Sequence, residues 1–144
     1  MTQNIVALVD LDDEGSAQIT LANAIDHARH TGARLHILNV VPDGMLKMTI
    51  VAQLIPDDYE QKLADHARQQ LTALIGQQET EGVAVEPAVR LGSVYKEVLR
   101  YARDVEADLI VMGAHRPEVK DYLLGSNAAQ VVRHAPCSVW VVRA

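Results

Sequence analysis

The sequence contains no phenylalanine, one tryptophan and one cysteine, and aromatic residues make up 3% of its 144 positions. Because Cys137 is the single cysteine, no disulfide can form within the chain. The scarcity of aromatic side chains disfavours a flavodoxin-like electron carrier, which stacks its flavin on aromatic rings. A chain of this length buries roughly 68–70% of its surface when it folds, so it needs no disulfide or metal to hold it together.

Long apolar runs and an excess of positive charge are also missing. No stretch approaches the roughly 20 apolar residues that a membrane-spanning helix needs, and residues 1–4 lack the features of a signal peptide. With 13 Lys and Arg against 19 Asp and Glu, the net charge of −6 repels a phosphate backbone. We therefore expect one cytoplasmic domain over residues 1–144, with no membrane or nucleic-acid partner.

The familiar catalytic and nucleotide-binding signatures are absent. The chain contains no G-x-G-x-x-G, no G-x-x-x-x-G-K-[ST], no H-E-x-x-H and no G-x-S-x-G. Cys137 falls in a predicted strand, where a small buried hydrophobe is more typical than a nucleophile. The histidines show no zinc-ligand spacing, and we interpret five of the six as surface or helix-end residues: His27, His30, His36, His66 and His134.

Five short runs rich in apolar residues predict strands, and helical stripes fall between them. Four of the runs are almost continuously apolar, which is typical of parallel strands covered on both faces. The run from Val83 to Val89 alternates more than the others. The predicted strands are Ile5–Val9, Leu35–Val41, Val83–Val89, Leu109–Met112 and Ser138–Val142.

Strands that alternate with helices predict an α/β fold, namely a single doubly wound parallel sheet with helices on both faces. We expect five strands in the order 3-2-1-4-5, as in Rossmann-like domains. Ligands bind such sheets at the carboxyl ends of the strands that flank the switch in strand order. Here those strands are the first and the fourth, so candidate site residues follow Val9 and Met112.

Glycine and small polar residues follow the predicted fourth strand. Gly113 leaves room for a ligand to approach the backbone. Gly125, Ser126 and Asn127 open the last predicted helix, whose free amides and positive dipole end favour an anion. The residues fit two interpretations, a phosphate site or an ordinary turn in which Ser126 only caps the helix.

Acidic residues follow the predicted first strand. Asp10 directly ends a buried strand, where its carboxylate could accept from ribose hydroxyls, face a metal or only cap a helix. We interpret Asp12, Asp13 and Glu14 as solvated or capping residues.

The residues that follow the predicted fourth strand closely resemble those of the universal stress proteins, and the resemblance covers the whole chain. It looks most like the bacterial F/G-type subgroup, whose members also end in GSNAA…VVRHA. The N-terminal strand, the end of the second strand and the Gly92-Ser93 helix start fit as well. The segments that carry the resemblance most specifically are Gly113–Arg116, Leu123–Ala129 and Val131–Val139.

This resemblance implies an adenine-nucleotide alpha-hydrolase-like fold that binds ATP, alone or with Mg²⁺. ATP-binding members carry G-x2-G-x9-G-[S/T], in which Gly113 matches the first glycine and Gly125-Ser126 the last pair. Arg116 stands at the second glycine, the gap to Gly125 holds eight residues, and Leu8 replaces a frequent proline. Arg116 could pair with a phosphate or fill the space that a glycine leaves.

The resemblance also implies a role for each matching residue. Asp10 should approach the ribose or phosphates, and Val40 should line the adenine pocket with its backbone reading the base edge. The remaining implied nucleotide contacts are Gly113, Ala114, His115 and Arg116 around the ribose and phosphates, and Gly125, Ser126 and Asn127 on the phosphates.

The implied assembly is a homodimer through the last strand, Ser138–Val142, with Trp140 facing either the core or the seam. A long apolar edge strand should not stay bare, which agrees with this expectation.

We therefore expect an ATP-binding stress-response regulator, with an unidentified downstream protein, rather than an enzyme with turnover. No general base is well placed, although Asp10 and His115 leave slow ATP hydrolysis open. The alternative is a dimeric interaction scaffold of the same family that has lost nucleotide binding, as Arg116 and the shortened loop suggest. A phosphorylated receiver domain is disfavoured, because the third strand ends without aspartate and the fifth without lysine.

The segment Asp43–Ile55 is apolar for a loop, and it fits a lid, a partner surface or a further helix.

Overall fold

A parallel five-stranded sheet forms the centre of the computed structural model, which describes residues 3–43, 53–114 and 125–143. The strand order is β3-β2-β1-β4-β5, which confirms the predicted fold. In register, Val6 of β1 lies between His36 of β2 and Ile110 of β4. The strands are β1 (Asn4–Leu8), β2 (Arg34–Val41), β3 (Val85–Leu91), β4 (Leu109–Gly113) and β5 (Ser138–Val142).

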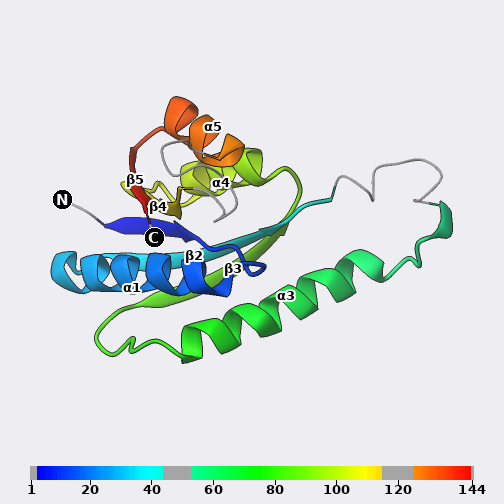
Figure 1. The fold of residues 1–144 in the computed structure, drawn as a ribbon, viewed down its shortest axis with the longest axis horizontal. Helices are drawn as coiled ribbons and strands as arrows, with labels where there is room; N and C mark the ends of the chain where they lie inside the picture. Colours follow the sequence, from blue (N-terminus) through cyan, green and yellow to red (C-terminus); the bar gives the residue numbers. More distant parts are fainter. Residues whose placement is uncertain (1–2, 44–52, 115–124, 144) are drawn as a thin grey trace.

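Two pairs of helices cover the two faces of the sheet, as Figure 1 shows. Helices α1 (Glu14–Thr31) and α3 (Tyr59–Gly76) lie on one face. Helices α4 (Val94–Asp104) and α5 (Ser126–His134) lie on the other. Among the described residues, no helix is both long and apolar enough to cross a bilayer.

Successive strand residues enter different cores, because side chains alternate across a sheet. Ile5 and Ile37 pack with Leu21 and Leu71 beneath α1 and α3. The next residues in each strand, such as Val6 and Leu38, pack with α4 and α5 instead. Both faces of the central strands are therefore buried, which explains their nearly continuous apolar runs.

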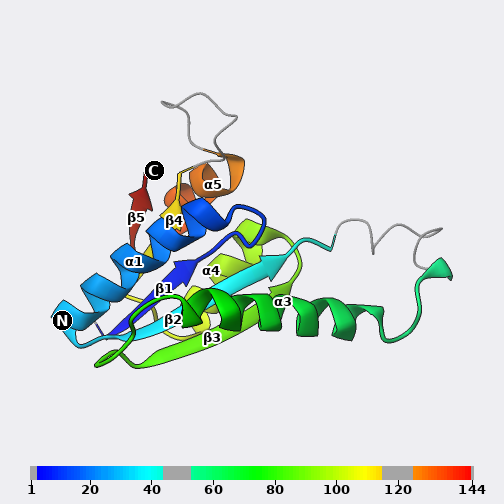
Figure 2. The ribbon, with the colours of Figure 1, turned by 60° about the horizontal axis from the view of Figure 1, so that its bottom comes forward.

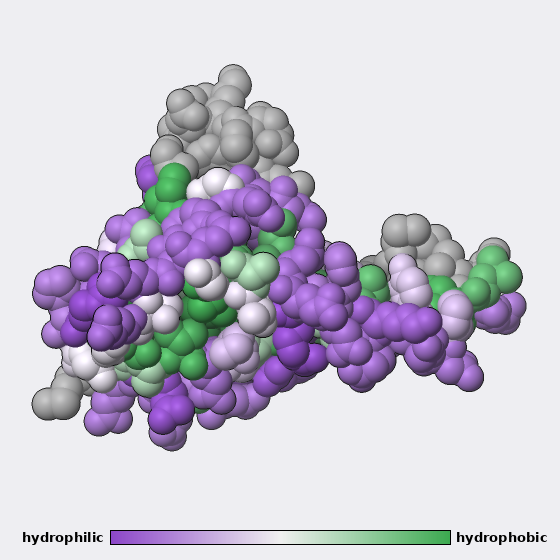
Figure 3. Space-filling view, turned by 90° about the horizontal axis from the view of Figure 1, so that it is seen from below, coloured by the Kyte–Doolittle hydropathy of each residue, from purple (hydrophilic) through white to green (hydrophobic). Residues whose placement is uncertain are grey.

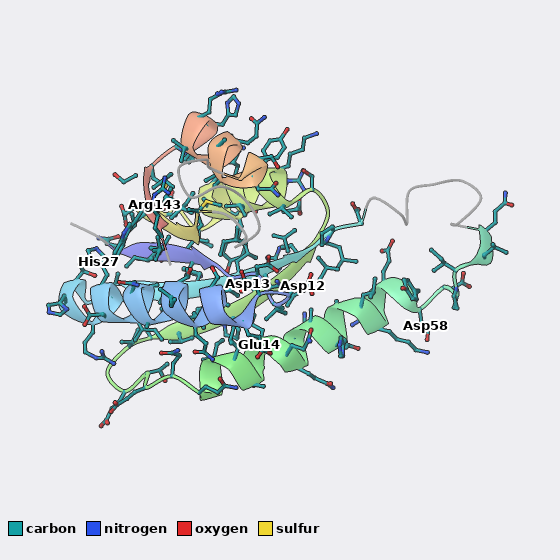
Figure 4. All side chains as sticks on the ribbon, viewed as in Figure 1. Asp12, Asp13, Glu14, His27, Asp58 and Arg143 are labelled. Atoms are coloured by element: carbon teal, nitrogen blue, oxygen red, sulfur yellow. The ribbon has the colours of Figure 1, made fainter. Side chains whose placement is uncertain are left out.

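Helix α3 extends beyond the sheet at its N-terminal end (Figures 1 and 2). Asp58, which precedes it, lies far from the strands in Figure 4. Between α1 and α3 a band of hydrophobic residues is visible in Figure 3. Most of the segment predicted as a lid, surface or helix lies outside the described residues.

Two predictions about where strands begin were wrong. Strand β3 begins at Val85 rather than Val83, because the Val83 N–H closes a turn onto the Thr80 carbonyl at 3.0 Å, with Gly82 at φ +80°. Cys137 precedes β5 instead of lying within it, and it is half-buried. Burial raises the pKa of its thiol, so the neutral form is favoured.

His36 is a buried residue rather than the surface residue that we predicted, since only 4% of it is exposed. Its Nε2 lies 3.1 Å from Asn4 Oδ1, and its Nδ1 lies 3.1 Å from the Tyr101 hydroxyl. An amide oxygen only accepts, so Nε2–H donates to Asn4 and the neutral ring accepts from Tyr101 through Nδ1. Burial lowers the pKa of His36, an effect that the Glu86 carboxylate partly opposes. The ring therefore serves as a neutral bridge between β1, β2 and α4.

Candidate functional site

A cavity of about 520 Å³ opens at the carboxyl ends of β1, β2 and β4. The first turns of α1 and α5 and one side of α3 complete its walls. All seven predicted site residues within the described ranges line it: Asp10, Val40, Gly113, Ala114, Gly125, Ser126 and Asn127. The other two, His115 and Arg116, lie outside the described residues.

The loop between β1 and α1 forms one rim of this cavity and is held by its own aspartates. The Asp13 N–H donates to the Asp10 carbonyl at 3.2 Å, and the Asp12 N–H donates to Asp10 Oδ1 at 2.9 Å. Asp13 Oδ1 accepts from the Ser16 N–H at 3.3 Å, which confirms that Asp13 caps α1. Figure 4 shows Asp12, Asp13 and Glu14 together at this helix start. The positive end of the α1 dipole is thus offset by the protein's own carboxylates.

The opposite rim, where β4 is followed by α5, is organised differently. The Ala114 N–H donates to the Val142 carbonyl at 3.0 Å, and the Gly125 N–H donates to the Ala114 carbonyl at 2.8 Å. Gly125 therefore does not offer its amide to a ligand. The first turn of α5 contains no acidic residue, and no side chain caps it. Within the described part of the chain, no group accepts from the backbone N–H groups of Ser126, Asn127 and Ala128, the first amides of α5.

Gly113 is a glycine for a reason that the sequence did not reveal. A Cβ built at this position would lie 3.1 Å from Ser16 Oγ and 3.7 Å from Thr20 Oγ1. The first distance is shorter than an ordinary van der Waals contact, so the bare Cα lets α1 pack closely on the end of β4. Gly113 also lines the cavity, but its lack of a side chain first serves the packing of α1.

The cavity has further wall residues that sequence reasoning missed. Helix α3 contributes the half-buried Leu63, the exposed His66 and Gln70, and the buried Ala67. No sequence signal indicated that α3 would reach over the strand ends. Ser16 and Thr20 of α1 also line the cavity, and their spacing of four residues was a usable signal, because it places two hydroxyls on one helical face.

The described lining is acidic. Asp10, Asp12 and Asp13 contribute carboxylates, and no lysine or arginine lines the cavity among the residues that the structure describes. Within those same ranges, no group of three or more His, Cys, Asp or Glu side chains could hold a metal ion. A divalent cation would therefore need further oxygen ligands, such as water or phosphate, beside one of these carboxylates.

Comparison with known proteins decides the family. The model of the universal stress protein family matches residues 1–143. The chain belongs to this family. It is 31% identical over 145 residues to universal stress protein G of Salmonella typhimurium, a match that covers 99% of this chain and 100% of the relative. This likeness fits the subgroup that the sequence suggested.

Solved structures of universal stress proteins share the fold. The UspA protein of Lactobacillus plantarum is 27% identical, with a TM-score of 0.72 over 99% of this chain and 98% of that one. A universal stress protein from Archaeoglobus fulgidus, in complex with dAMP, is 19% identical, with a TM-score of 0.61 over 96% of both chains. At that identity the second likeness supports the fold alone.

Proposed function

We propose that this universal stress protein binds an adenine nucleotide, ATP in the first instance, in the cavity at the strand ends. The observation that carries the proposal is the cavity itself, which joins the end of β2 to the open amides of α5 across the switch point. We take an adenine nucleotide as the ligand class because a member of the same family, from Archaeoglobus fulgidus, was solved in complex with dAMP.

The electrostatics of the two helix starts orient the ligand. Carboxylates surround the first turn of α1, whereas the first turn of α5 has no acidic residue, and three of its amides have no acceptor among the described residues. An anion is therefore stabilised at the start of α5 and repelled at the start of α1. The phosphates therefore belong at Ser126 and Asn127, and the base belongs at the other end of the cavity, beside Val40. Asp10 lies in the loop after β1 and Gly113 is the last residue of β4, and these two strands separate β2 from β5 in the sheet.

Mg²⁺ is part of the proposal, because a polyphosphate beside Asp10 and Asp12 would suffer like-charge repulsion. A magnesium ion with several waters could link one of these carboxylates to the phosphate oxygens. Occupancy of the site would then regulate an unidentified downstream protein in the cytoplasm, rather than supply a substrate for turnover.

Calorimetric titration of nucleotide-free protein with Mg-ATP tests the proposal. We expect one site per chain and a dissociation constant of about 1–100 μM, that is about −8 to −5.5 kcal/mol. Titration with ATP in EDTA should show weaker binding, since the carboxylates then face bare phosphates. If neither heat nor a shift in melting temperature occurs at millimolar Mg-ATP, nucleotide binding is refuted. The result would then favour the alternative, a dimeric interaction scaffold that has lost nucleotide binding.

We also infer that two chains associate through β5. Within the described part of the chain, β5 pairs with β4 on one side and has no strand on the other. Trp140 on this strand is 36% exposed and contacts the His27 ring edge to face, with centroids 5.8 Å apart. An unpaired edge with an exposed indole is suited to pairing with a second copy.

Trp140→Glu is expected to convert the dimer into monomers. The change puts like charges near the two-fold axis and removes an aromatic anchor, which weakens association by about 30-fold or more. Sedimentation equilibrium over a concentration series measures it. Ile19→Glu is the matched control, because Ile19 is 41% exposed on α1 and should leave the dimer intact. A parent that stays monomeric, or a Trp140 variant as dimeric as the parent, would refute the β5 interface.

A further inference from the structure

Thr20 is a buried polar residue whose hydroxyl has no hydrogen-bond partner among the described residues. It lies in the middle of α1, is 2% exposed, and lines the cavity. On the same helix, the Thr31 hydroxyl behaves as helical threonines commonly do and donates to the His27 carbonyl at 3.0 Å. A buried hydroxyl that lacks such a bond destabilises the empty protein and calls for an explanation.

The same deficit occurs at a second side chain of the cavity wall. Asn39 at the end of β2 is 6% exposed, and its Nδ2 donates to the Val9 carbonyl at 3.0 Å. Because a carbonyl can only accept, this bond fixes the amide orientation and leaves Asn39 Oδ1 as an acceptor. No described residue donates to that oxygen. Two buried polar groups of one cavity therefore lack hydrogen-bond partners among the described residues, and a ligand in the cavity can supply such partners.

The position of Thr20 indicates which part of a nucleotide would reach it. Its hydroxyl lies against the end of β4, 3.7 Å from where a Cβ of Gly113 would stand. In the sheet, β1 and β4 separate the β2 end from β5, and α5 follows β4. Thr20 thus lies beside the end of β4, two strands away from Val40, where the base is proposed, and next to the strand that leads to α5, where the phosphates are proposed. A nucleotide that spans the cavity from Val40 to α5 would pass Thr20 with its middle part. The part of a nucleotide between base and phosphate is the sugar.

We propose that the Thr20 hydroxyl binds a ribose hydroxyl of the ligand and is a specificity-determining group of the site. The inference rests on the proposed nucleotide binding and deepens it. A threonine hydroxyl both donates and accepts, so it matches a sugar hydroxyl, which does the same. This contact favours binding, because the Thr20 hydroxyl, which has no hydrogen-bond partner among the described residues, acquires one in the complex.

Thr20→Val tests the role of the hydroxyl, since valine keeps the branched shape and removes only the polar group. We expect the melting temperature of the nucleotide-free protein to rise by about 2–4 °C and the affinity for Mg-ATP to fall about ten-fold. Opposite signs for stability and binding distinguish a ligand contact from a structural role. Thr20→Ser should restore most of the affinity, and Thr31→Val, the matched control outside the cavity, should bind as the parent does.

Deoxy analogues identify the contacted group. Among ATP, 2′-deoxy-ATP and 3′-deoxy-ATP, one analogue should lose about ten-fold in affinity for the parent and nothing further for Thr20→Val. If each deoxy analogue loses as much affinity for Thr20→Val as it does for the parent, Thr20 contacts neither sugar hydroxyl and the inference is overturned. A parent that binds Mg-ATP together with an equally tight Thr20→Val variant overturns this inference alone. A parent that binds no adenine nucleotide overturns the proposed function, and this inference with it.

Discussion

Gly125→Val is expected to abolish ATP binding, with a loss of affinity of about 100-fold or more, as a branched side chain enters the phosphate end of the cavity. The backbone at Gly125 has φ −61° and ψ 157°, an extended conformation that any residue adopts. Its N–H bond to the Ala114 carbonyl can also persist. The variant should therefore fold normally while its side chain competes with the phosphates that the α5 amides attract.

Titration calorimetry with Mg-ATP measures the loss, and circular dichroism checks that the fold is intact. Gly76→Val is the matched control, because Gly76 lies outside the cavity and a Cβ there meets nothing within 4 Å. If Gly125→Val binds ATP as tightly as the parent, the phosphates do not lie at the start of α5, and the orientation of the ligand must be reversed or abandoned.

The arrangement of the sheet could be predicted because it depends on local patterns. Apolar runs of strand length alternate with helical stripes, and the handedness of parallel crossovers leaves few ways to connect them. The position of the cavity followed from the same reasoning, since the strand ends at the switch point must converge. Asp13 was foreseeable as a capping residue, because it stands one residue before a helix and is acidic.

Features that depend on long-range packing could not be predicted. His36 is buried because its strand position faces α4, where Tyr101 supplies a partner 65 residues away. The α3 wall of the cavity depends on how far that helix extends past the sheet, which no local pattern encodes. The Gly125 amide seemed open from the sequence, yet it bonds to Ala114, because the ends of β4 and α5 meet in space.

Few buried residues hold helix α3 against the rest of the protein. Although the helix has 18 residues, only Ala67, Leu71 and Leu74 are buried. Leu71 is completely buried in the core beneath α1 and α3 and does not line the cavity. The fixed position of an entire cavity wall therefore depends on a short stripe of contacts in which Leu71 is central.

Leu71→Ala is expected to destabilise the protein by about 2–5 kcal/mol, because truncation of a fully buried leucine removes its transfer free energy and leaves a cavity. Urea unfolding followed by circular dichroism gives the free energy of unfolding. The matched control is Leu54→Ala, since Leu54 is 80% exposed and its truncation should change that free energy by about 0.5 kcal/mol or less. A loss below about 1 kcal/mol at Leu71 would mean that α3 is held by something other than its buried stripe. Because Leu71 touches no proposed ligand group, its variant should still bind Mg-ATP at low temperature, where the folded state persists, and this separates a loss of stability from a loss of the site.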